Sequence, residues 1–164
     1  MLRLFVFAAL IATCAVAHAD DADAPPGTQQ FPIADRHHTQ GTVHYPQTPP
    51  VGGPHNPVWQ NCGFYRQPVA NENAVHSMEH GVVWITYTPD LPNHQALRSL
   101  IRPHVLISPY PGLPSAVVAS AWGRQLQLDS PLDLRLPQFV DAFVFGQQAP
   151  EPHGPCEGGT GEPE

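Results

Sequence analysis

Residues 82–87 form a continuous run of β-branched and aromatic side chains that starts directly after Gly81. A strand with one face in water would alternate polar and apolar residues, so a run without alternation indicates a strand buried on both faces. We therefore place this strand at the centre of a sheet. The residues just before Gly81 are then held at the edge of the core.

The segments around this strand predict further helices and strands. A short helix begins at Asn71 or Asn73 as N-cap and stops at Gly81. The order of helix and strand patterns along the chain predicts an α+β fold. We expect a single compact domain in which a mixed β-sheet packs with two to three helices. The other predicted elements are helices within residues 91–102 and 138–145, strands at 105–108 and 116–122, and a short edge strand at 125–129.

The N-terminus has the layout of a secretory signal peptide. Arg3 precedes a short apolar run, and Ala17-His18-Ala19 has the small-x-small pattern that precedes a signal-peptidase cleavage site, here after Ala19. We expect residues 1–19 to be removed and the protein to be periplasmic or secreted. The apolar run is too short for a permanent membrane span. Cys14 offers a lipoprotein alternative, but Thr13 before it is larger than such sites normally need.

The rest of the chain is long enough for one domain with its own core. Residues 20–48 are polar and rich in Pro, Gly and His, which predicts an extended arm that contributes little to the core. Residues 49–149 form the globular domain, and residues 150–164 form a C-terminal tail rich in Gly, Pro and Glu.

Charge and cysteine content limit the partners and the compartment. The chain has seven basic residues, all of them arginine, against fourteen acidic ones. No basic patch is available, which excludes a nucleic-acid partner. Once the signal peptide is removed, Cys62 and Cys156 remain, and an even pair in an exported chain favours a disulfide. That bond would clamp the tail to the domain and contribute roughly 4–5 kcal/mol.

Ten histidines in 164 residues are an unusual number. Five of them fit an ordinary role as solvated or locally hydrogen-bonded rings, because they fall in the arm, at the start of an element or in the tail. These five are His37, His38, His94, His104 and His153.

His76 and His80 stand out because they are four residues apart on the predicted short helix. At this spacing both imidazoles leave one face of the helix and can chelate a metal ion. Glu79 lies on the flank of that face. Three roles are open to it: a ligand, a partner that fixes a histidine tautomer, or a general base. His55 follows a rigid Pro/Gly turn and is the expected third imidazole, with His44 as the fourth.

The string from His76 to His80 also satisfies H-x-x-E-H, the signature of inverted zinc metallopeptidases. We do not assign that activity, because those enzymes carry the motif on a long helix, whereas here Gly81 and a strand follow directly. The sequence lacks a G-x-S-x-G elbow, a phosphate loop and a Cys-x-x-Cys motif, so nucleophilic, nucleotide and thiol-redox chemistry have no support.

Five blocks of the sequence stand out together: Tyr45 with residues 49–55, and residues 62–65, 75–81, 120–123 and 149–151. In content and order they resemble the bacterial domain-of-unknown-function family numbered 3105. The resemblance covers the chain from His44 onward, and it implies an exported or membrane-tethered single domain whose recurrent features are these histidines and Glu79. It supplies no activity. The chain departs from the family at residues 51–53, where Val-Gly-Gly replaces a hydroxyl-bearing residue and Ser-Gly.

The sequence therefore predicts an extracytoplasmic protein that binds Zn(II) or Cu(II) through His55, His76 and His80, with His44 or Glu79 completing or supporting the site. One alternative is a metal-dependent hydrolase that uses Glu79 as its base. Another is a cell-envelope binding module in which the histidines are structural. The sequence does not name a protein partner.

Overall fold

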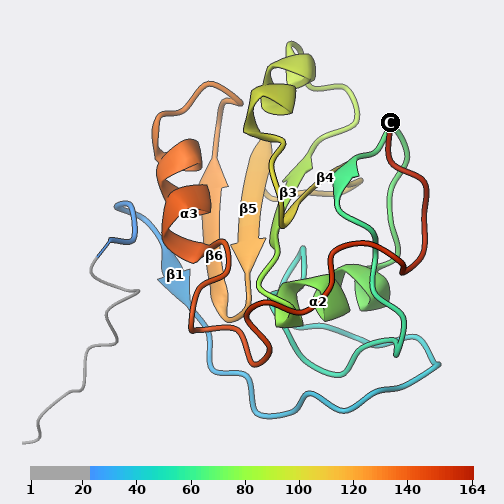
Figure 1. The fold of residues 1–164 in the computed structure, drawn as a ribbon. Helices are drawn as coiled ribbons and strands as arrows, with labels where there is room; N and C mark the ends of the chain where they lie inside the picture. The colour runs from blue at the N-terminus through green and yellow to red at the C-terminus, as the bar shows by residue number, and fades with distance from the viewer. Residues whose placement is uncertain (1–22) are drawn as a thin grey trace, which may run out of the picture.

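The computed structural model describes residues 23–164, so the expected signal peptide lies outside the described residues. Within this range the chain forms one six-stranded mixed sheet in the order β1-β6-β5-β3-β4-β2, with helices on both faces (Figure 1). The predicted α+β fold is confirmed. No helix among the described residues is long and apolar enough to cross a membrane.

Strand β3 (Val83–Tyr87) is the apolar run predicted from the sequence, and all five of its residues are buried. It pairs in parallel with β4 (Val105–Pro109) and antiparallel with β5 (Val117–Ala121). Strand β5 continues antiparallel to β6 (Arg124–Leu128). The strand predicted to be central is therefore central.

The two faces of the sheet carry separate apolar clusters, because successive strand residues point to opposite sides. Val83 and Ile85 pack under helix α3 (Arg135–Phe143), with the 3₁₀ helix η1 (His94–Leu100) beside the same cluster. Trp84 instead packs against helix α2 (Asn71–Glu79). Helix α2 thus lies against the core on the face opposite α3.

Three helix predictions need correction. Helix α2 has Ala70 as its N-cap, with no side-chain cap. The second predicted helix is a 3₁₀ helix, which begins after Asn93 in the left-handed conformation. Helix α3 starts at Arg135, earlier than predicted, because Pro137 lies in its first turn, where a missing N–H is tolerated.

The arm and the tail are better ordered against the domain than the sequence indicates. Strand β1 (Gln29–Gln30) pairs with β6, so β6 is not the edge strand that we predicted. Strand β2 (Gly63–Phe64) forms the opposite edge. The arm continues past α2, and the C-terminal segment crosses the same helix (Figure 1). Ile33 and Tyr45 of the arm pack against the α2-side cluster.

A disulfide joins Cys62 to Cys156, with their Cα atoms 5.4 Å apart. Next to it, the Cys62 amide donates to the Cys156 carbonyl at 2.9 Å. The tail therefore lies along the segment before β2, and the Thr160 amide donates to the Trp59 carbonyl.

Candidate metal centre

Helix α2 positions three of the predicted site residues at its C-terminal end. His76, Glu79 and His80 are each no more than 5% exposed. The helix stops where Gly81 adopts a φ of 85°, a conformation that side chains other than glycine rarely take. Strand β3 begins two residues later, so these side chains lie at the edge of the core.

His55 is fully buried at the end of the Pro/Gly turn. Its Nδ1 donates a hydrogen bond to the Gly53 carbonyl at 2.9 Å. The turn is held from outside by Tyr45, whose hydroxyl donates to the Pro54 carbonyl at 2.7 Å. The ring centroids of His55 and His76 are 4.8 Å apart, although the two residues come from different elements.

His38 joins this group, which the sequence did not predict. The arm pairs with the turn through the Thr39 amide, which donates to the His55 carbonyl at 2.7 Å. This pairing brings the His38 ring within 5.0 Å of His55 and 5.1 Å of His76, measured between centroids. The His38 ring is exposed, as a residue of the arm is expected to be, but its contact with two other imidazoles goes beyond that expectation. Its backbone pairing with a residue seventeen positions later has no local sequence signal.

One nitrogen from each of His38, His55 and His76 and one Glu79 oxygen lie within 4.8 Å of one another. Three of the four residues are buried and His38 is exposed. Four donors around one tetrahedral ion would be separated by about 3.3 Å at metal–ligand bonds of about 2.0–2.1 Å. Small side-chain rotations would close the difference.

His55 and Glu79 make an unusual contact at the centre of this group. His55 Nε2 lies 2.9 Å from Glu79 Oε2. The two atoms are not aligned as a hydrogen bond, and His55 Nε2 is a buried nitrogen without a hydrogen-bond partner among the described residues. In the neutral ring the hydrogen is on Nδ1, bonded to Gly53, so Nε2 presents a lone pair to a carboxylate oxygen.

His76 is also held in one orientation by a backbone carbonyl. Its Nδ1 donates to the Asn56 carbonyl at 2.6 Å, which leaves Nε2 free. Burial is the main reason that the pKa of His76 is lowered to about 4; the hydrogen bond to Asn56 opposes this shift, and the nearby histidine rings add to it. The ring therefore stays unprotonated at neutral pH.

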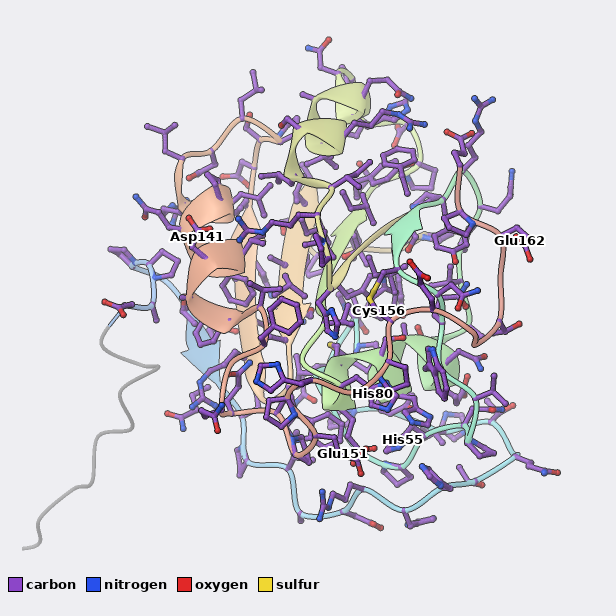
Figure 2. The ribbon with its side chains drawn as sticks, viewed as in Figure 1. His55, His80, Asp141, Glu151, Cys156 and Glu162 are labelled. Carbon is purple, nitrogen blue, oxygen red and sulfur yellow. A yellow bond between two sulfur atoms is a disulfide. The ribbon has the colours of Figure 1, made fainter. Side chains whose placement is uncertain are left out.

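His80 lies beside the four-residue group but is not part of it. Its ring centroid is 4.6 Å from that of His76, yet its Nδ1 donates to the Pro155 carbonyl at 2.7 Å and its Nε2 is 3.8 Å from Glu151 Oε2. Figure 2 shows His55, His80 and Glu151 at the end of the molecule where α2 lies. His80 therefore contacts the C-terminal segment.

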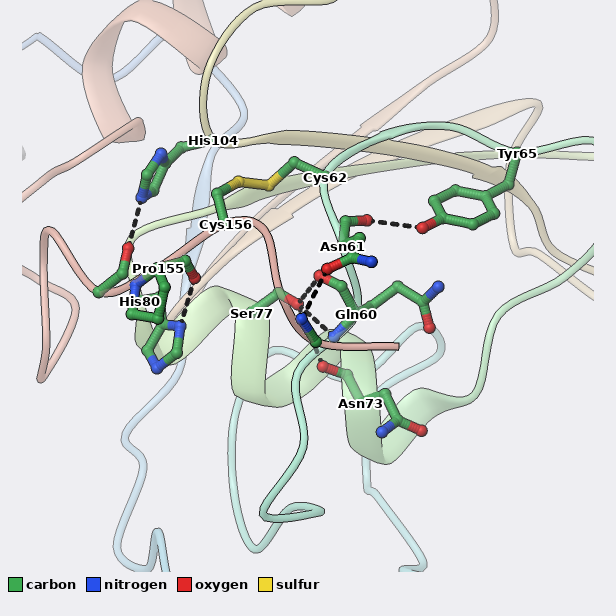
Figure 3. The surroundings of a disulfide bond; sticks show 12 residues. Gln60, Asn61, Cys62, Tyr65, Asn73, Ser77, His80, His104, Pro155 and Cys156 are labelled. Atoms are coloured by element: carbon green, nitrogen blue, oxygen red, sulfur yellow. Dashed lines mark hydrogen bonds between the residues drawn. A yellow bond between two sulfur atoms is a disulfide. The ribbon is translucent and has the colours of Figure 1, made fainter. Parts of the chain in front are cut away.

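His104 supports the same segment, because its Nε2 donates to the Gly154 carbonyl at 2.9 Å (Figure 3). Burial lowers the pKa of His104. Two imidazoles and the disulfide thus fix residues 154–156. His44, the expected fourth imidazole, is exposed and lies outside the four-residue group.

Comparison with known families agrees with the resemblance noted in the sequence. A family described as protein of unknown function (DUF3105) matches residues 37–158. The chain belongs to this family. Neither the curated proteins nor the solved structures gave a significant match. The matched range begins at His37 and includes all four residues of the group, so the part of the arm that carries His38 belongs to the family domain.

Proposed function

We propose that this protein is an extracytoplasmic metal-binding protein that holds Zn(II) or Cu(II) through His38, His55, His76 and Glu79. The observation that carries the proposal is the contact between His55 Nε2 and Glu79 Oε2. Two buried acceptor atoms at this distance repel each other unless a cation, either a proton or a metal ion, lies between them. The neighbouring imidazole nitrogens supply further ligands.

The orientation of the rings supports a metal over a proton. His55 and His76 each donate Nδ1–H to a backbone carbonyl, which is the arrangement that metal-binding histidines usually have. It fixes the tautomer and directs Nε2 inward. A single proton would need only one such nitrogen, whereas this group brings three imidazoles to one carboxylate.

The donor types favour Zn(II) or Cu(II). Imidazole suits both ions, and a carboxylate completes a site for a divalent cation. The cysteines at positions 62 and 156 are paired with each other, and Met78 is buried in the α2-side cluster. Within residues 23–164, the cysteines are thus oxidised and the methionine is packed in the core, so this part of the chain offers no thiolate or thioether ligand set for Cu(I). The disulfide also suits the periplasmic or secreted location that the N-terminal residues predict.

Glu79 fits a ligand better than the general base of a hydrolase. Its carboxylate faces His55 on one side and Arg36 Nη1 at 3.7 Å on the other. A general base needs a free oxygen directed at the bound water, whereas Glu79 points at the imidazoles. The hydrolase alternative therefore ranks below metal binding.

The test is the metal content of untagged protein isolated from its own compartment. We expect about one equivalent of zinc or copper per chain, lost in His55→Ala and in His76→Ala. His94→Ala is the matched control, because His94 stacks on Tyr87 away from the group. Folded wild-type protein that carries no metal, and binds neither ion when titrated, would contradict the proposal and leave the non-metal binding module.

A further inference from the structure

An open cavity of about 430 Å³ borders the four-residue group on the side of the arm. Two of its lining residues also contact the group. Arg36 Nη1 lies 3.7 Å from Glu79 Oε1, and the indole of Trp122 meets the His55 ring edge-on, with centroids 6.1 Å apart. The cavity and the candidate metal site thus share a boundary.

The charges around this boundary would change when a metal binds. A divalent ion held by three neutral imidazoles and Glu79 leaves one positive charge uncompensated, and Arg36 adds a second. Asp35 also lines the cavity and stays a carboxylate, because hydrogen bonds from His37 at 2.9 and 3.1 Å lower its pKa. Glu79, Arg36 and Asp35 together therefore carry one negative charge without the ion and one positive charge with it. The metal-bound site would therefore attract an anion beside Arg36.

The walls indicate what kind of anion fits. The lining is mainly polar; Ile33, Trp122 and Pro150 supply its apolar walls, and Arg36 supplies a planar cation whose donors match a carboxylate. The Arg36 side chain is 59% exposed and its ion pair with Glu79 is long. Arg36 can therefore turn from Glu79 toward a ligand in the cavity.

We infer that the cavity binds a small organic carboxylate next to the metal, with Arg36 as its counter-charge and Trp122 and Ile33 against its apolar part. This inference rests on the proposed metal binding. The ion raises affinity for the anion through its charge, and the anion in return stabilises the bound metal by the same factor. The apolar walls favour propionate over an inorganic anion of similar charge.

Equilibrium dialysis with labelled propionate tests this, using the zinc-loaded and the metal-free protein. We expect zinc to strengthen propionate binding, and Arg36→Gln to weaken it about tenfold while zinc affinity stays within about threefold. Arg36→Lys should retain part of the affinity. Arg66→Gln is the matched control, because Arg66 is an exposed arginine that pairs with Glu164 elsewhere. The neutral isostere propionamide should bind far more weakly than propionate.

The outcomes separate the inference from the proposed function. If the protein binds zinc, any of three results overturns the carboxylate site alone. Propionate affinity is the same in Arg36→Gln as in the wild type, it is the same without zinc, or propionamide binds as well as propionate. Absence of zinc and copper binding in the folded wild-type protein overturns both. Stronger binding of chloride or phosphate than of propionate would also overturn the inference, because the apolar walls would then contribute nothing.

Discussion

Glu79 has an unusual environment for a buried side chain, because its carboxylate faces an imidazole nitrogen without a hydrogen bond. A carboxylate next to an imidazole lone pair costs stability in the metal-free protein. Residues arranged for binding commonly carry such a cost, because selection acts on the bound state. Replacement of Glu79 should therefore have opposite effects on folding and on metal binding.

We predict that Glu79→Gln raises the free energy of unfolding of the metal-free protein by about 1 kcal/mol, because the new amide can donate to His55 Nε2. The same variant should bind zinc on the order of 10–100-fold more weakly. Urea denaturation and competition with a zinc chelator measure the two effects. A loss of stability would instead indicate that His55 is protonated and paired with Glu79.

His76 gives a pH prediction for the metal-free protein. Its pKa is lowered to about 4 in the folded state, against about 6.5 in the unfolded chain. Between these values the unfolded chain binds a proton that the folded chain does not, so stability falls as the pH drops from about 6.5 to about 4. An NMR titration of the His76 ring checks the pKa, and a midpoint near 6.5 would contradict it.

At the scale of elements, the sequence predicted what local patterns determine. The apolar run predicted β3, and the residues before Gly81 predicted α2. Both predictions were possible because periodicity and turn residues are local signals that extend over only a few positions. Strands β1 and β2 were missed, since two-residue strands carry no periodicity. The structured course of the arm was missed as well, because it depends on pairing with distant residues such as His55.

The turn between α2 and β3 is the element on which the site depends most. Gly81 has a φ of 85°, and a Cβ there would lie 3.1 Å from the Phe145 Cα and 3.3 Å from the Pro152 Cα. Gly112 has a similar φ of 78°, but nothing lies within 4 Å of its Cβ position. An alanine at either position would carry similar backbone strain, but only at position 81 would its Cβ also meet backbone atoms.

We predict that Gly112→Ala costs about 1 kcal/mol of stability, from backbone strain alone. Gly81→Ala should cost about 2–3 kcal/mol, because backbone atoms of Phe145 and Pro152 must also move. It should also weaken zinc binding, because Glu79 shifts with the end of the helix. Denaturation of both variants, with zinc competition, makes the comparison. Equal losses would show that the contacts at Gly81 have no effect.

At the scale of the molecule, the candidate site joins three segments that are distant in sequence. The spacing of His76 and Glu79 on one helix was predictable, and the turn before His55 indicated a fixed imidazole. The contact of His38 with His55 was not predicted, because the arm pairs with the turn through backbone hydrogen bonds that have no residue-type signature. The contact of His80 with the C-terminal segment likewise depends on distant residues, and metal binding by His80 stays a prediction. Tertiary packing thus decides which side chains meet at the candidate site.

The disulfide allows a last prediction about how these segments are held. Cys62 and Cys156 are 94 positions apart, so removing the bond in Cys62→Ser/Cys156→Ser should lower the free energy of unfolding by roughly 4–5 kcal/mol. Metal affinity should change by less than about threefold. The reason is that His55 and His76 are anchored by the Gly53 and Asn56 carbonyls, which lie outside the clamped tail.

Calorimetry of the metal-free double variant measures its free energy of unfolding. Zinc competition, at a temperature where the variant remains folded, measures its metal affinity. His80 should become more mobile in the double variant, because its Nδ1 donates to Pro155, the residue next to Cys156. Its NMR signal should then broaden or shift while that of His76 stays in place. A folded double variant that no longer binds zinc would mean that the C-terminal segment, through His80 or Glu151, supplies a ligand, and the four-residue site would have to be redrawn around it.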